Sequence, residues 1–256
     1  MEDYDSTQPS DFEPMRKSLF TLTLSLWSLI AVSSGFGNSR GYKFEVMQWL
    51  EQDAKGNIVS KTNEYAGIQL LKGQAAVTRP GLQLELRSSI GEIVRLGADT
   101  HFSLLHDRQI KLLKGEMLFY LPQSQAPFRI HSPQTTVEIT QKGVLVAQVT
   151  TNGGLKLLAL QGSIRLHLEG QNHDLEPGKL YFIPPGPSRL GKHLHFNLKL
   201  FLETTGLVQN FQPSLPVQKK MENTAFRQSF FIHKQTRLFV GDAKSEEDFD
   251  LLLLKP

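Results

Sequence analysis

The chain has 256 residues, no cysteine and a formal net charge of +3 at pH 7. Hydrophobic residues at 39% and charged residues at 21% are typical of a folded domain, which argues against wholesale disorder and against many membrane spans. The lack of cysteine excludes disulfides, zinc–thiolate sites and thiol nucleophiles. We expect one main domain with appendages, and no nucleic-acid partner, because the basic residues are scattered and not clustered with aromatic ones.

The N-terminal segment has the three parts of a secretory signal peptide. Two basic residues precede an uncharged run at residues 19–32, and small residues follow it. The run is shorter than the roughly 20 apolar residues of a spanning helix. We therefore predict that residues 1–34 are an export signal with an acidic leader. A retained single-pass membrane anchor and a buried core helix are the alternatives, and Met15 is a candidate translation start.

From about residue 41 to residue 190 the sequence predicts strand after strand. Leu82, Leu84 and Leu86 alternate with polar residues, which is the period of a strand with one buried face. Turn sequences rich in glycine and proline separate the segments. The pattern predicts an all-β fold, either a two-sheet sandwich or a short β-solenoid-like domain. Expected strands lie at residues 82–86, 92–96, 101–105, 109–113, 117–121, 128–130, 136–139, 144–149, 155–160, 164–168 and 179–183.

A weak internal repeat places glycine inside three strand-like segments. The residues around Gly73 resemble those around Gly115, and the segment around Gly162 is a looser third copy. Glycine within a strand pattern marks a bulge, a bend or a close approach of two backbones. We expect these three glycines to be corners where the chain leaves one sheet for the other.

After about residue 190 the pattern becomes helical. Asn197 is a good N-cap residue, and Gly206 is a candidate residue just past the helix end. A second short helix is expected at residues 222–230. We therefore expect a short helical extension over residues 191–233 and a flexible tail over residues 234–256.

The strand segments also carry a family resemblance. Residues 93–105 with 110–119, then residues 128–139 and 157–166, resemble the centre of the FecR domain. The later segments 175–185 and 197–208 resemble signal-peptide-bearing FecR-domain proteins of verrucomicrobial type. The resemblance implies the periplasmic β-domain of this family.

FecR proteins span the inner membrane, control a sigma factor through a cytoplasmic domain and sense an outer-membrane transporter. Here at most the first 17 residues are available on the cytoplasmic side, too few for a folded anti-sigma domain. The resemblance thus implies an exported, non-catalytic protein that binds, senses or scaffolds in the cell envelope. Its expected location is the periplasm or another exported location, or the inner membrane if residues 19–32 are retained. Its expected partner is an envelope protein or polymer.

One pair of residues is a candidate for catalysis or metal binding. His193 and His195 would lie on the same face of a strand, a spacing that suits a metal site. The alternative function is therefore a metal-dependent, cupin-like enzyme using these two residues. No third ligand is evident, and a carboxylate pair of Glu169 with Asp174 or Glu176 is expected to be solvated. We predict no catalytic, cofactor-binding or metal-binding residue, and no cofactor.

Overall fold

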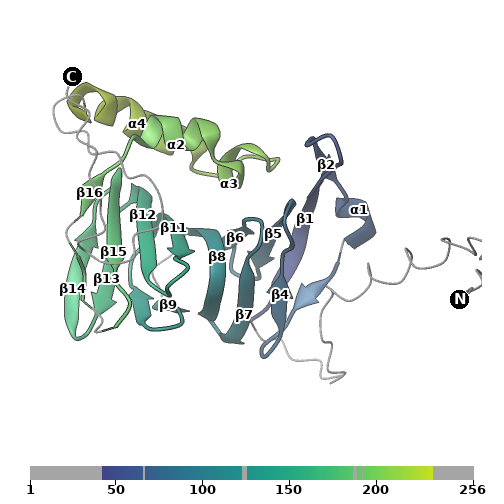
Figure 1. Ribbon diagram of the computed structural model, residues 1–256, viewed down its shortest axis with the longest axis horizontal. Coiled ribbons are helices and arrows are strands. Elements are labelled where there is room, and N and C mark those ends of the chain that lie inside the picture. Colours follow the sequence, from purple (N-terminus) through teal and green to yellow (C-terminus); the bar gives the residue numbers. More distant parts are fainter. Residues whose placement is uncertain (1–41, 66, 123–125, 187–188, 192, 233–256) are drawn as a thin grey trace, which may run out of the picture.

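The computed structural model describes residues 42–65, 67–122, 126–186, 189–191 and 193–232. Within them, 16 strands form one continuous hydrogen-bonded sheet, accompanied by short helices. The all-β expectation is confirmed (Figure 1). The strands are β1 (Phe44–Gln52), β2 (Ile58–Ser60), β3 (Gln69–Leu70), β4 (Ala75–Val77), β5 (Leu82–Ser88), β6 (Ile93–Leu96), β7 (His101–His106), β8 (Gln109–Leu121), β9 (Phe128–His131), β10 (Thr136–Ile139), β11 (Gly143–Val149), β12 (Leu155–Gly162), β13 (Ile164–Leu168), β14 (Gln171–Leu175), β15 (Lys179–Ile183) and β16 (Leu194–His195). The helices are α1 (Thr62–Tyr65), α2 (Leu198–Thr204), α3 (Gly206–Gln209) and α4 (Gln218–Ile232).

Strand β8 joins two sections of the sheet. Its residues 109–114 pair antiparallel with β7 and parallel with β9. These strands belong to the second section, which also holds β4, β10, β13 and β14. Residues 115–121 of β8 pair with β11 and β6 in a first section that also holds β1, β5, β12, β15 and β16. The strands therefore form one sheet that bends at β8, not two separate sheets.

The two sections share one hydrophobic core. A single cluster of buried side chains draws on strands of both sections. Phe44 of β1 meets Phe102 of β7 with ring centroids 6.1 Å apart, and Phe119 of β8 meets Phe128 of β9 at 5.3 Å. Burial of these rings stabilises the facing arrangement of the two sections.

The three repeat glycines lie where the chain changes section. Gly73 lies between β3 and β4, Gly115 lies within β8, and Gly162 ends β12 just before β13. Their φ angles are 81°, 86° and 95°, in the region that only glycine adopts without strain. The expectation that these glycines are corners is confirmed.

One expectation about strands was wrong, and one long strand was not predicted. Residues 109–113 and 117–121, expected as separate strands, are one strand, because the chain crosses from one section to the other without losing its pairing. Strand β1 was not predicted. Its pairing with β5 shifts register between Val46 and Gln48, which breaks the period-two pattern.

The C-terminal helices cover the outer face of the first section. Leu198 of α2, Leu207 of α3 and Met221 of α4 belong to a second hydrophobic cluster with sheet residues that include Leu118 and Phe182. Figure 1 shows these helices along one side of the sheet. The buried residues of the other core, between the two sections, all come from strands.

The ends of these helices partly differ from expectation. The Asn197 side chain accepts a hydrogen bond from the Leu200 amide at 3.0 Å, as expected of an N-cap. Gly206 follows the C-cap residue Thr205 and so lies just past the end of α2, as expected; it is also the first residue of α3. Helix α4 begins at Gln218, earlier than the expected helix at residues 222–230, and its added first turn includes Met221, which belongs to the second hydrophobic cluster.

Two predicted segments lie outside the described residues: the export signal or anchor at residues 1–34 and the tail at residues 234–256. In the described part of the chain, none of the helices has the length and apolar character needed to cross a membrane.

Candidate binding site

A buried ion pair fastens the C-terminal segment to the sheet. Arg95 of β6 lies opposite Glu85 of β5, and the Arg95 Nε to Glu85 Oε2 distance is 2.8 Å. The other guanidinium nitrogens donate to the carbonyls of Leu207 at 3.0 Å and Pro213 at 3.2 Å. The Arg95 guanidinium carbon also lies 4.7 Å from the centre of the Phe211 ring. Because all these partners lie inside the protein, the role of Arg95 is to stabilise the fold.

A second buried charge cluster lies at the start of β6. Arg108 Nε is 2.8 Å from Glu92 Oε1, and Ser88 Oγ donates to Glu92 Oε2 at 3.2 Å. The Tyr42 hydroxyl donates to the same carboxylate. Burial, followed by the negative charge of Glu92, raises the pKa of Tyr42 far above its ordinary value. Tyr42 therefore stays protonated and acts as a hydrogen-bond donor.

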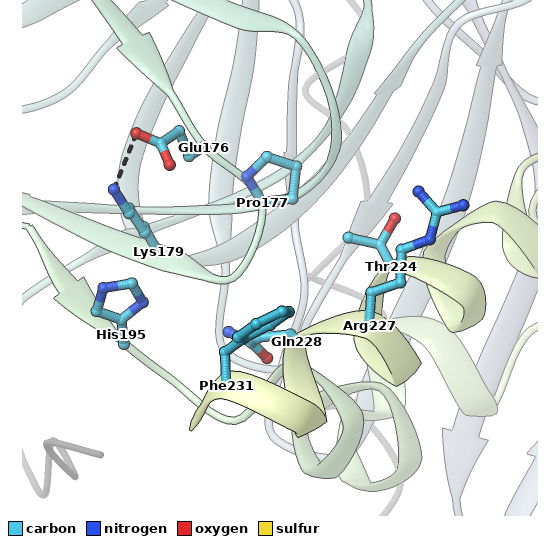
Figure 2. A pocket seen from close by; sticks show the side chains of 8 residues that line it. All are labelled: Glu176, Pro177, Lys179, His195, Thr224, Arg227, Gln228 and Phe231. Atoms are coloured by element: carbon cyan, nitrogen blue, oxygen red, sulfur yellow. Dashed lines mark ion pairs between the residues drawn. The ribbon is translucent and has the colours of Figure 1, made fainter. Parts of the chain in front are cut away.

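An open cavity of about 350 Å³ lies between the sheet edge and α4. Figure 2 shows the sheet residues on one side of it and the helix residues on the other. The cavity is lined by Glu176, Pro177, Lys179, His195, Thr224, Arg227, Gln228 and Phe231. It lies beside β16, which among the described strands pairs only with β15.

Gln228 fixes the relative position of the two walls. Its Nε2 donates to the carbonyls of Gly178 at 3.1 Å and Phe196 at 2.9 Å, and its Oε1 accepts from the Leu198 amide at 3.0 Å. One side chain therefore ties α4 to the β14–β15 turn and to the start of α2. The cavity is a fixed feature of this packing.

The cavity carries an excess of positive charge. Lys179 Nζ lies 2.9 Å from Glu176 Oε1, and this bond holds the pKa of Glu176 below its usual value. Arg227 has no ion-pair partner in the described part of the chain. Together with the ring of Phe231, these groups suit a ligand group that is anionic and partly apolar. Nothing in the arrangement pairs a nucleophile with a base.

We expect the imidazole of His195 to titrate below its ordinary pKa of 6.5. Partial burial is the main cause, and the positive charge of Lys179 adds to it. Because native His195 binds protons less readily than unfolded His195, its contribution to stability is full above pH 6.5 and falls as the pH decreases below that value. Titration of the imidazole by NMR measures the shift. Lys179→Gln should raise the pKa of His195, and an unchanged value would contradict the electrostatic account.

The structure brings His193 and His195 together, with ring centroids 6.0 Å apart and nearly perpendicular planes. No group of three histidine, aspartate or glutamate residues within the described ranges is placed to hold a metal ion. The carboxylates suggested by the sequence go to separate partners, since Asp174 pairs with Arg165 and Glu176 pairs with Lys179. The sequence gives no sign of Lys179 or of the lining residues of α4 as site residues, because only tertiary packing brings β15 and α4 together.

The fold is that of an all-β domain with a helical layer on one face. One part of the chain, residues 74–165, matches the family model described as FecR protein. It contains both buried ion pairs and precedes the cavity residues in the sequence.

Two crystal structures of a candidate anti-sigma factor from Parabacteroides distasonis also resemble the chain. The identities are 14% and 13%, and the TM-scores are 0.41 and 0.42. The matches cover 51% and 52% of this chain but only 64% and 65% of those chains. No curated protein matches the chain.

Proposed function

We propose that the protein is a non-catalytic binding or sensing module of the bacterial cell envelope. The observation that carries the proposal is the FecR domain match at residues 74–165. The buried charged groups of this domain support the non-catalytic part of the proposal. Arg95 pairs with Glu85 and Arg108 pairs with Glu92, so these charges stabilise the fold. The sequence of residues 1–34 supports export, with cleavage or retention of an anchor as the two routes to the envelope.

We propose that the partner is an envelope protein or polymer that presents an anionic group to the cavity beside β16. The positively charged side chains of Lys179 and Arg227 favour an anionic group on the partner. The short edge strand β16 lies next to the cavity and offers backbone groups to a bound chain.

Photo-crosslinking in native envelopes tests this function. A crosslinking amino acid in place of Thr224, in the cavity, should capture one reproducible partner, and Arg227→Glu should reduce the yield by about tenfold through charge reversal. The matched control position is Lys55, an exposed residue of the β1–β2 turn. Capture at Lys55 but not at position 224, or capture unaffected by Arg227→Glu, would contradict the proposed site.

A further inference from the structure

Helix α4 presents an unusual aromatic surface to solvent. Phe226, Phe230 and Phe231 are 63%, 65% and 74% exposed, more than any other large hydrophobic side chain in the described part of the protein. The rings of Phe226 and Phe230 contact each other edge to face, with centroids 4.9 Å apart. Clustered exposed apolar surface of this kind marks an interaction site more often than chance.

These rings are not loosely packed members of the core. The buried face of α4 carries Met221 and Ala225, both in the second hydrophobic cluster. Phe230 follows Met221 by nine residues, or two and a half helical turns, so it points to the opposite side of the helix. Phe226 lies one turn before Phe230 on the same outward face. The helix therefore has two apolar faces, one of which has no partner among the described residues.

The outward face is also basic. Lys219 lies on the same side of the helix as Phe226 and Phe230, and Arg227 lies beside them. None of the cations of α4 forms an ion pair within the described part of the chain, and Glu222 is its single acidic residue. Exposed aromatic rings with basic residues beside them suit a contact with an anionic membrane surface, where the rings bury apolar area and the cations meet lipid phosphates.

We propose that the α4 face formed by Lys219, Phe226, Arg227 and Phe230 docks on a bilayer that contains anionic phospholipids. The rings enter the boundary between headgroups and acyl chains, and the two cations contact lipid phosphates. The positive charges of this face favour an anionic bilayer over a protein partner with an uncharged apolar groove. The inference adds a membrane contact to the proposed binding function. Because Arg227 also lines the cavity, the test uses only the protein and lipid vesicles, with no cavity partner present.

A local fluorescent probe in the full chain tests the contact. In a Trp27→Phe background, which removes the tryptophan of the N-terminal apolar run, Phe230→Trp places a probe on the face. The remaining Trp49 is buried and stacks on Tyr65. The protein is mixed with vesicles whose acyl chains carry bromine, made of phosphatidylcholine alone or with phosphatidylglycerol. The matched control is Ile58→Trp, which is exposed on β2, away from α4.

We expect the tryptophan at position 230 to be quenched in vesicles with phosphatidylglycerol, and less so as salt rises. Replacing Lys219 and Arg227 by glutamine should lower the affinity of the protein for these vesicles about fivefold for each charge removed. Absence of quenching, equal quenching without phosphatidylglycerol, or equal quenching at position 58 would overturn the proposal. So would shielding of position 230 from a water-soluble quencher without lipid, which would show that protein covers the face.

Discussion

Replacement of Arg95 by alanine is expected to lower the free energy of unfolding by about 3–5 kcal/mol. The Glu85 side chain is only 2% exposed, so the substitution would leave its carboxylate without its main cationic partner inside the protein. It also removes the donors to the carbonyls of Leu207 and Pro213. Urea unfolding measures the loss, and hydrogen exchange should show the segment after α3 opening before the sheet.

Two further variants separate the ion pair from general effects of truncation. Arg129→Ala removes a half-exposed ion pair with Glu138 and should change stability by less than about 1 kcal/mol. Arg95→Met combined with Glu85→Leu should recover part of the loss, because no buried charge is left unpaired. An Arg95→Ala protein as stable as Arg129→Ala would contradict the role of Arg95 in holding the C-terminal segment.

Substitution of Gly115 by alanine is expected to cost about 3 kcal/mol, from backbone strain and overpacking together. The φ angle of Gly115 is 86°, and an added Cβ would lie 2.6 Å from the Thr100 Cα atom and 2.8 Å from the Asp99 carbonyl oxygen. Because both contacts are with backbone, a side-chain rotation cannot relieve them. Thermal or urea unfolding measures the effect.

Gly73→Ala is the matched control, since Gly73 occupies the equivalent corner with a φ angle of 81° but has no atom within 4 Å of an added Cβ. It should cost only the backbone preference of glycine, about 1 kcal/mol. Equal losses of stability in the two variants would contradict the expected cost of steric crowding around position 115.

The sequence was most informative where local geometry determines the structure. The alternating leucines of β5 and the three repeat glycines each follow from the backbone conformation of a few neighbouring residues, and the structure confirms both. The bulged β1 was missed because its apolar residues follow no single period. The start of α4 was missed because Met221, the buried residue of its first turn, packs against residues that are distant in the sequence.

The candidate sites depend on contacts between distant segments. Arg95 lies among apolar residues of β6, and the sequence does not show that its partners come from residues 207–213. The cavity likewise joins Lys179 to Arg227 of α4, so neither residue was recognised. His195 was recognised from its spacing, but as a metal ligand, and its described surroundings instead supply a lysine and a glutamate.

The location of the protein in the cell is the most direct test of its proposed role in the envelope. After expression in a Gram-negative host, the cells are fractionated and the intact mass and N-terminal sequence of the protein are measured. We predict a product in the envelope: soluble in the periplasm and starting near Gly35, or full length in the inner membrane. The first result would assign an exported binding module and the second an anchored one. Full-length soluble protein confined to the cytosol would contradict the account.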